Sequence, residues 1–253
     1  MVVVDPADVN AAGRVDLGKG VADLLGRRLH DGAVLGLGWG GNPSEWIGRT
    51  AEVLRTSRRA APAAADLTVV QMAGAAPSDP TRVNPMRTVA AVADALDAND
   101  LLVAAPLYVD SAATASSLRA DRSIADTIAA VDRADVCVFG VGHVTTTTPL
   151  FVNGYLDEAE LAGLRAAGAV GDVCGRFFDA DGAPVDGDLA ERTIGARLEQ
   201  IAARPLRIAI AAGPERVEPL AAALRGRLAN AVVTDTPTAL ALVERAGLHP
   251  TEA

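Results

Sequence analysis

The chain has 253 residues, half of them hydrophobic, and its 32 acidic residues outnumber its 23 basic ones, so that the formal net charge is −9. This balance argues against binding to the phosphate backbone of nucleic acids, which basic side chains drive. No apolar run reaches the roughly 18 residues that a membrane span needs, and the first ten residues carry acids but no basic residue, unlike a secretory signal peptide. We therefore expect a cytoplasmic protein with no membrane partner.

Short apolar runs alternate with longer amphipathic segments along the chain. Runs typical of buried strands start about 34 residues apart and cover residues 33–38, 67–74, 101–109 and 135–142. Amphipathic segments predict helices over 14–30, 43–55, 85–98 and 121–133, and two further strand–helix units cover 206–225 and 230–246. This alternation predicts an α/β fold with a Rossmann-like, mostly parallel sheet and helices on both faces.

Capping signals mark the starts of several predicted helices. Asn42-Pro43-Ser44-Glu45 and the stretch from Asp157 to Glu160 match capping boxes. Pro214 and Pro237 suit the first helical position, where a missing N–H group costs nothing.

Residues 140–205 break the alternation of strands and helices. They hold a threonine-rich loop, a short helix and the segment 168–185, in which a turn at residues 179–182 predicts a small hairpin. We expect an insert at about 143–205 within a single domain that spans residues 1–253, with its core at about 14–246, because no flexible linker divides the chain.

The cysteines and histidines predict no metal site. Cys137 and Cys174 each lie in an apolar, strand-like stretch, which favours two reduced core thiols in a cytosolic protein. The chain has no CxxC motif, and its three histidines lie far apart.

A glycine-rich loop follows the first predicted strand, and ligands of parallel sheets bind beyond the carboxyl ends of the strands. Residues 36–41, Gly-Leu-Gly-Trp-Gly-Gly, match GxGxxG before a helix whose free N–H groups would form an anion site. A dinucleotide would need an acid at the end of the second strand, where Gln71 stands. The loop therefore favours one phosphate or carboxylate group and no nicotinamide cofactor; alternatively, the glycines only permit a turn and Asn42 only caps the helix.

Polar residues and glycines also follow the other predicted strands. Amides and carboxylates can bind hydroxyl groups, and arginine can bind phosphate, which together suit a phosphorylated sugar. Each residue alone is more often a cap or turn former, and a lone loop histidine is seldom a general base. No catalytic motif stands out. The candidate ligand-binding residues are Gly38, Gly40, Gly41, Asn42, Ser44, Gln71, Gly74, Asn84, Gly142, His143, Asp172 and Arg216.

Several motifs resemble, in order, the effector domain of SorC/DeoR-type sugar-responsive transcriptional regulators, from about residue 32 to residue 246. They are LGLGWGGNPSEWIG, TVVQMAG, AAPLYVDS, DVCVFGVG, GAVGDVCGRFFDADGAPV and IAIAAGPERVEPLAAALRGRLANAVVTDTPTALAL. The resemblance implies a fold like that of sugar-phosphate isomerases, glucosamine-phosphate deaminases and CoA-transferases. It also implies a phosphorylated sugar effector, a homo-oligomer (dimer or tetramer), and DNA contact only through a helix-turn-helix that is absent from this chain.

The resemblance assigns roles to individual residues. It implies a phosphate cradle at Gly40, Gly41, Asn42 and Ser44, an adjacent wall at Gln71, Gly74 and Asn84, a carboxylate for sugar hydroxyls at Asp172, and a phosphate-facing cation at Arg216. Arg216 stands where the family usually has lysine, and Asn42-Pro43 where it commonly has threonine. Pro43 removes one N–H group from the cradle. Because Lys19 is the only lysine, covalent capture of the sugar is not expected.

Three classes of function stay open on the sequence. The favoured one is an effector-sensing module of a transcriptional regulator. The alternative is a free-standing isomerase-like or deaminase-like enzyme with Asp172 and His143 as acid and base. The third is a structural subunit. No helix-turn-helix precedes residue 14, and the sequence leaves open whether the chain is a fragment or a free-standing domain.

Overall fold

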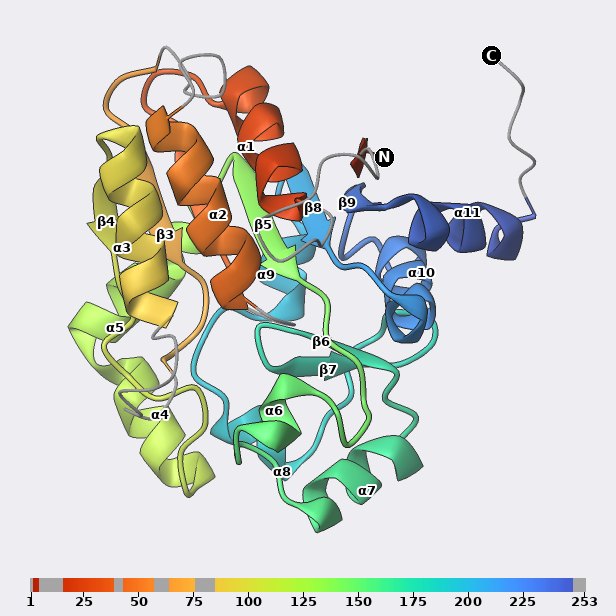
Figure 1. The fold of residues 1–253 in the computed structure, drawn as a ribbon. Coiled ribbons are helices and arrows are strands. Elements are labelled where there is room, and N and C mark those ends of the chain that lie inside the picture. Colours follow the sequence, from red (N-terminus) through yellow and green to blue (C-terminus); the bar gives the residue numbers. More distant parts are fainter. Residues whose placement is uncertain (1, 5–15, 39–42, 57–63, 76–84, 248–253) are drawn as a thin grey trace.

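A seven-stranded parallel sheet forms the centre of the molecule, which confirms the predicted α/β architecture (Figure 1). The computed structural model describes residues 2–4, 16–38, 43–56, 64–75 and 85–247. The strand order is β1-β9-β8-β5-β2-β3-β4, and each neighbouring pair is parallel. The strands are β1 (Val2–Val4), β2 (Val34–Leu37), β3 (Thr68–Gln71), β4 (Asn99–Leu101), β5 (Val136–Gly140), β8 (Leu206–Ile210) and β9 (Ala231–Asp235).

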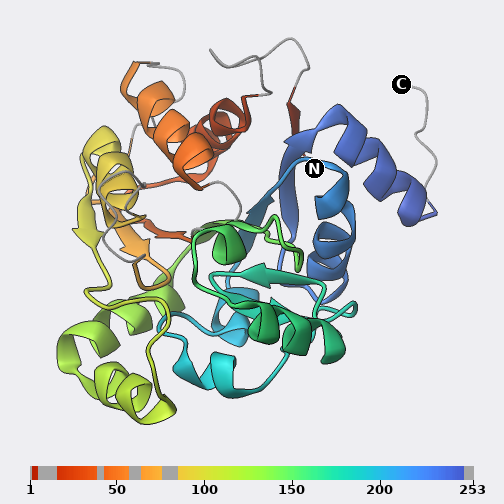
Figure 2. The same ribbon diagram turned by 60° about the horizontal axis from the view of Figure 1, so that its bottom comes forward.

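Helices pack on both faces of this sheet (Figures 1 and 2). Successive residues of β5 point to opposite faces, so Val138 packs in one hydrophobic cluster while Cys137 and Phe139 pack in the other. The first cluster includes α1 (Leu17–Arg28), α2 (Pro43–Thr56) and α3 (Pro85–Leu96); the second includes α5 (Arg122–Ala130), α9 (Leu198–Ala202), α10 (Val217–Arg225) and α11 (Thr236–Arg245). Burial on both faces explains why the strand sequences are almost wholly apolar.

The chain order reverses between the two central strands. From β2 the chain continues through β3 to β4 on one side, and from β5 it continues through β8 to β9 on the other. Such a reversal leaves a crevice beyond the carboxyl ends of the two central strands, where ligands of doubly wound sheets bind.

The structure contains the predicted turn at residues 179–182 and a second, tighter hairpin turn just before it. Strands β6 (Gly171–Val173) and β7 (Arg176–Phe178) are antiparallel and joined by Cys174 and Gly175. Both residues have positive φ angles, 54° and 73°, as a two-residue hairpin turn requires. At the turn formed by residues 179–182, Gly182 N donates to Asp179 O (2.9 Å), and the chain then returns antiparallel to β7: Phe178 forms a bridge with Pro184, and Val185 N donates to Phe177 O (2.9 Å). The predicted hairpin turn is therefore confirmed.

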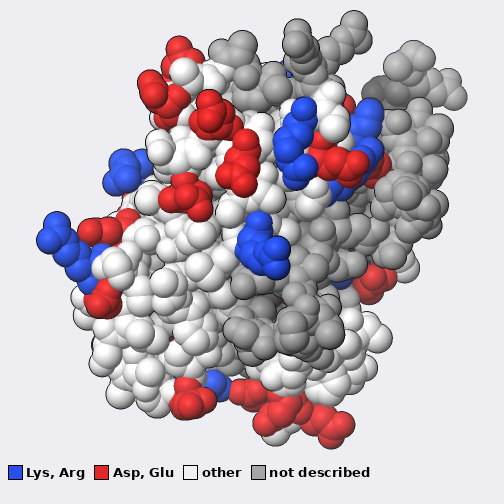
Figure 3. All heavy atoms as spheres, turned by 60° about the vertical axis from the view of Figure 1, so that its left-hand side comes forward, with Lys and Arg blue, Asp and Glu red and all other residues white. Residues whose placement is uncertain are grey.

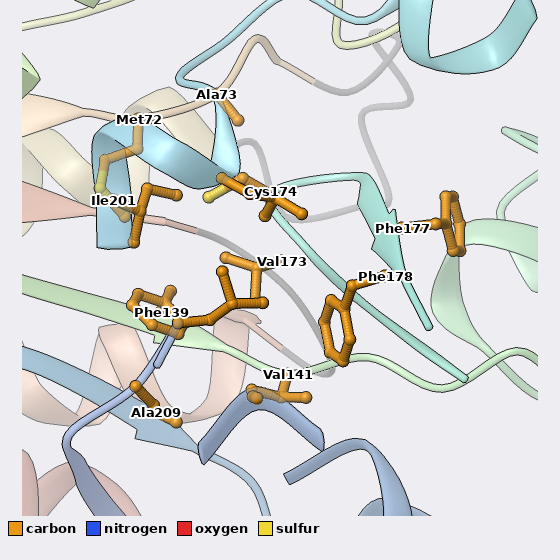
Figure 4. Packing of buried hydrophobic residues seen from close by; sticks show 14 of the residues in the cluster. Met72, Ala73, Phe139, Val141, Val173, Cys174, Phe177, Phe178, Ile201 and Ala209 are labelled. Atoms are coloured by element: carbon orange, nitrogen blue, oxygen red, sulfur yellow. The ribbon is translucent and has the colours of Figure 1, made fainter. Parts of the chain in front are cut away.

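Packing decides the register of the hairpin. Val173 and Phe178 point toward Val141 and Phe139 of the core, whereas Phe177 lies on the opposite side of its strand (Figure 4). A shift of one residue in the turn at Cys174 and Gly175 would change the side chains that meet the core. The sequence analysis predicted the turn at 179–182 and missed this second one, because its register depends on packing.

The predicted strand at 101–109 is wrong over most of its length. Only β4 pairs with β3, and residues 102–109 leave the sheet. Pro106 cannot donate to a strand ladder, and isolated bridges link it to Ala75 and link Tyr108 to Thr193. The apolar run is buried by these loop contacts rather than by strand pairing.

The sequence analysis did not predict several short strands and helices. Strand β1 extends the sheet beside β9. The helix α4 (Ala112–Ala120) precedes α5, and α6 (Pro149–Val152) and α8 (Asp188–Arg192) lie before and after α7 (Glu158–Ala166), which is the short helix that the sequence analysis predicted. The predicted capping box at Asp157 and Glu160 is confirmed at the start of α7. No helix within the described ranges is long and apolar enough to cross a bilayer.

Candidate functional site

The crevice between β2 and β5 begins at two glycines. Gly38 follows β2 and donates its N–H to Val138 O (2.8 Å), and Gly142 follows β5 and donates to Asp172 O (2.9 Å). A Cβ atom on Gly38 would lie 2.5 Å from Cys174 Sγ. The turn of the hairpin therefore rests directly on the end of β2, which brings β6 to the site.

Asp172 in β6 occupies the space beside Gly142. A Cβ atom on Gly142 would lie 1.7 Å from Asp172 Oδ1, so no other residue fits there while the carboxylate keeps its place. Asp172 is 2% exposed, and its Oδ2 accepts a hydrogen bond from Gly175 N (3.2 Å). The turn of the hairpin thus orients the carboxylate toward the strand ends.

Arg216 reaches the same place from the other half of the sheet. It ends the short 3-10 helix η2 (Pro214–Arg216) after β8, and its Nη1 donates to Val141 O (2.6 Å). Its Nε is buried and has no hydrogen-bond acceptor among the described residues. The nearest carboxylate oxygen with which it pairs, on Glu215, lies 3.9 Å from Nε. The guanidinium group therefore keeps an unused donor in the crevice.

Burial shifts the pKa of both acid–base groups here. Desolvation raises the pKa of Asp172 to about 6, against the opposing effects of Gly175 N–H and Arg216. Desolvation, helped by Arg216, lowers the pKa of His143 to about 4. At pH 7 the carboxylate is mostly ionised and can accept sugar hydroxyl groups, while His143 is neutral, with its Nδ1 2.7 Å from Thr145 Oγ1.

Gln71, which ends β3, and Gly74, which follows it, hold neighbouring backbone segments in place. Gln71 is fully buried; its Nε2 donates to Ala73 O (2.6 Å) and its Oε1 accepts from Val103 N (3.2 Å). Gly74 donates its N–H to Ile194 O (3.0 Å), and a Cβ atom there would meet Pro106 O at 2.4 Å. The amide of Gln71 thus ties β3 to the segment that leaves β4.

Three residues of the predicted cradle fall outside the described residues, namely Gly40, Gly41 and Asn42, as does Asn84 of the predicted wall. Ser44 lies in the first turn of α2, which begins at Pro43 as predicted. Of the sequence candidates, the described structure brings together Gly38, Gly142, His143, Asp172 and Arg216.

Two residues outside the candidate set support the site. Tyr108 Oη donates to Gly175 O (2.7 Å), and burial, with Asp172 nearby, raises the pKa of Tyr108. Thr238 Oγ1 accepts from Gly213 N (2.9 Å) and so fixes the loop before Arg216. Tyr108 stands in an apolar run and Thr238 in a helix start, and neither position carries a local signal of a binding site.

The two cysteines are buried core thiols, as the sequence analysis predicted. Cys137 and Cys174 are free and buried, and burial raises the pKa of both, that of Cys137 to about 12. No group of three or more metal-ligating side chains occurs in the part of the chain that the structure describes. Figure 3 shows both acidic and basic side chains on the described part of one face.

Comparison with known proteins identifies the family. A family model described as "Putative sugar-binding domain" matches residues 1–244. The chain belongs to this family. The transcriptional regulator LsrR of Enterobacter sp. (strain 638) is 30% identical over 250 residues, which are 98% of this chain and 72% of that protein. The deoxyribonucleoside regulator of Bacillus subtilis is 29% identical over 242 residues, 96% of this chain and 74% of that one.

Solved structures agree with this assignment. A domain of a possible sugar-binding transcriptional regulator from Arthrobacter aurescens superposes with a TM-score of 0.80 at 28% identity, covering 96% of this chain and 91% of that chain. The full-length sorbitol operon regulator SorC from Klebsiella pneumoniae shares the fold, with a TM-score of 0.76 at 23% identity over 89% of this chain and 70% of that one.

These comparisons confirm the predicted resemblance to SorC/DeoR-type regulators and the role of an effector-sensing domain. The relatives named here are transcriptional regulators, and the alternative of an isomerase-like or deaminase-like enzyme finds no support among them.

Proposed function

We propose that the crevice between β2 and β5 binds a phosphorylated sugar as the effector of this sensing domain. The observation that carries the proposal is the convergence of Asp172 and Arg216, from the insert and from the loop after β8, on the ends of the two central strands. The carboxylate can accept hydrogen bonds from the hydroxyl groups of a sugar, and the unused donor of the guanidinium group can bind its phosphate, so the pair matches the two ends of a sugar phosphate.

The individual roles follow from charge and position. Asp172 would accept hydrogen bonds from sugar hydroxyl groups, and Arg216 would turn its Nε to the phosphate. The start of α2, with Ser44, and the glycines before it would add N–H donors to the phosphate. His143, neutral at pH 7, would bind a hydroxyl group rather than the phosphate.

The same proposal extends to the whole regulator. Residues 1–253 would act as one effector-binding domain in the cytoplasm, and copies of the chain would assemble as a dimer or tetramer. The signal would reach DNA through a separate helix-turn-helix domain, since the net charge of −9 disfavours direct contact with nucleic acid.

A thermal-shift panel tests the ligand class. Pentose and hexose phosphates are each compared with the matching unphosphorylated sugar. An effector at 100 times its Kd stabilises the fold by about 2.7 kcal/mol, which raises the Tm by several degrees. We expect a shift with a phosphorylated member and a much smaller one with its unphosphorylated partner. Equal shifts for both members of every pair, or no shift at all, would contradict the proposal.

Substitution of Arg216 tests its role. Arg216→Ala should abolish the preference for the phosphorylated sugar, and Arg216→Lys should retain part of it, because lysine keeps the charge but not the geometry. Arg225→Ala, which removes a half-exposed arginine from the end of α10, is the matched control and should change nothing. An unaltered preference in Arg216→Ala would remove this residue from the site.

A further inference from the structure

Three arginines line a cavity that lies apart from the strand-end crevice. Arg119 comes from α4, Arg176 from β7, and Arg197 precedes α9. The cavity has a volume of about 740 Å³ and includes none of the residues of the proposed sugar site. Helices α4 and α8 contact each other beside it, at the edge of the molecule that comes forward in Figure 2.

Two of these arginines are held unusually close together. Thr193 O accepts hydrogen bonds from both Arg119 Nη1 (3.0 Å) and Arg176 Nη2 (3.3 Å). The two guanidinium groups therefore lie within about 6 Å of each other, where like charges repel. The pKa of Arg176 is lowered, first by burial and then by the charges of Arg119 and Arg197.

Backbone carbonyl groups, and not carboxylates, hold this pair. Arg176 also donates to the carbonyl oxygens of Ala196 (2.8 Å), Ala190 (3.3 Å) and Gly195 (3.3 Å). Within the described ranges, no carboxylate oxygen lies within 4.0 Å of a guanidinium nitrogen of any of the three arginines. Carbonyl dipoles satisfy hydrogen bonds but leave the net charge of the cluster in place.

The remaining donors point to the position of a ligand. Arg119 Nη1 also donates to Glu191 O (2.9 Å), while its Nε and Nη2 have no acceptor among the described residues. Exposed Arg197 lies at the rim, where exposed Asp186, Glu191 and Glu199 also line the cavity. The half-buried floor is thus cationic, and the rim carries carboxylates that can accept hydrogen bonds.

We propose that this cavity is a second anion-binding site, for the phosphate group of a small metabolite that also carries hydroxyl or amino groups. The phosphate would bind Arg119 and Arg197 above Arg176, where it offsets the repulsion between the two arginines that share Thr193 O. Hydroxyl or amino groups of the same molecule would donate to the carboxylates at the rim. A volume of about 740 Å³ accommodates far more than a bare phosphate ion.

Titration with inorganic phosphate at constant ionic strength tests the site, with the amide signals of residues 189–197 followed by NMR. We expect saturable shifts of these signals that chloride does not produce. Arg197→Gln, which removes only an exposed side chain, should weaken the phosphate response about threefold to tenfold. Arg119→Gln should weaken it about tenfold or more. Arg122→Gln, which removes a 96% exposed arginine, is the matched control and should leave it unchanged.

The outcomes separate this site from the crevice. Arg216→Ala should leave the shifts of residues 189–197 intact, whatever it does to sugar binding. The proposal fails if phosphate shifts none of these signals, if chloride shifts them equally, or if both Arg119→Gln and Arg197→Gln respond like the unmodified protein. A variant that loses only the preference for the phosphorylated sugar in the thermal-shift assay reports on the crevice between β2 and β5, not on this cavity.

Discussion

Asp172 and His143 show how one environment acts in opposite directions on an acid and a base. Burial disfavours the charged form of either group, so the pKa of the carboxyl rises to about 6 and that of the imidazole falls to about 4. For Asp172 the folded protein binds a proton more tightly than the unfolded chain does. Its favourable contribution to stability is complete below pH 3.8 and is lost as the pH rises through about 6.

Asp172→Asn should remove this pH dependence. The free energy of unfolding of the variant, relative to the unmodified protein, should rise between pH 4 and pH 7 by on the order of 3 kcal/mol. Urea unfolding of both proteins across that range measures the difference. The lowered pKa of His143 has the opposite effect: its contribution to stability is present above pH 6.5 and is lost as the pH falls through about 4. Because both proteins contain His143, this effect cancels when their stabilities are compared. Parallel stability curves would show that Asp172 titrates normally.

At the scale of secondary-structure elements, periodicity predicted the central strands and their helices, because burial on both faces leaves a continuous apolar run. It failed where an apolar run is buried by other means. Residues 102–109 are as apolar as a strand, yet the amide of Gln71 and the bridge at Pro106 hold them outside the sheet. Likewise, the hairpin turn at Cys174 and Gly175 depends on which side chains meet the core.

Gln71→Leu should show the importance of that amide. Leucine fills a similar volume but leaves Val103 N and Ala73 O without partners in a buried place. We expect a loss of about 2–4 kcal/mol in the free energy of unfolding, measured in urea. Gln200→Leu is the control, because the Gln200 amide accepts from Arg197 N (2.9 Å) and donates to Asp132 Oδ1 (3.1 Å) at exposed positions, where water can replace it, so its loss should cost far less. Equal losses in the two variants would show that Gln71 has no special structural role.

The site itself was predictable only in part. The rule that ligands bind at strand ends led to Gly142, His143 and Arg216 from their positions after apolar runs, whereas Asp172 came from the predicted hairpin segment and the family resemblance. The strand-end rule does not predict that Asp172 packs against Gly142, a contact that joins the hairpin to the end of β5. Nor does it predict the role of Thr238, whose hydroxyl group fixes the loop before Arg216. Contacts between residues distant in sequence leave no periodic signal.

At the scale of the whole molecule, the crevice joins three parts of the chain. Gly142 follows β5, Gly175 belongs to the hairpin, and Gly213 follows β8; each donates its N–H to a group in or beside the site. Hydrogen bonds already link the end of β5 to the other two parts: Gly142 N donates to Asp172 O of the hairpin, and Arg216 Nη1 donates to Val141 O. A ligand that contacts all three parts would therefore stabilise them together.

Hydrogen exchange should reveal this coupling. With the sugar phosphate that gives the largest thermal shift, amide exchange at Gly142, Gly175 and Gly213 should slow by about tenfold or more. The amide of Gly32, which donates to Ala65 O before β2 begins, lies at the opposite end of the strands and is the control. Protection confined to the loop after one strand would contradict a site shared by the three parts.

The contact between Asp172 and Gly142 also bears on how such domains change over generations. A buried carboxylate costs the fold stability at neutral pH. Under the proposed role of Asp172 in effector binding, a lineage no longer selected for that binding gains stability by replacing Asp172 with a smaller, neutral residue. Once the carboxylate is gone, a side chain at position 142 no longer meets Oδ1 and becomes tolerable. In relatives that no longer bind an effector, we therefore expect the replacement of Asp172 to come first and the replacement of Gly142 to follow, while the strands of the sheet stay the same.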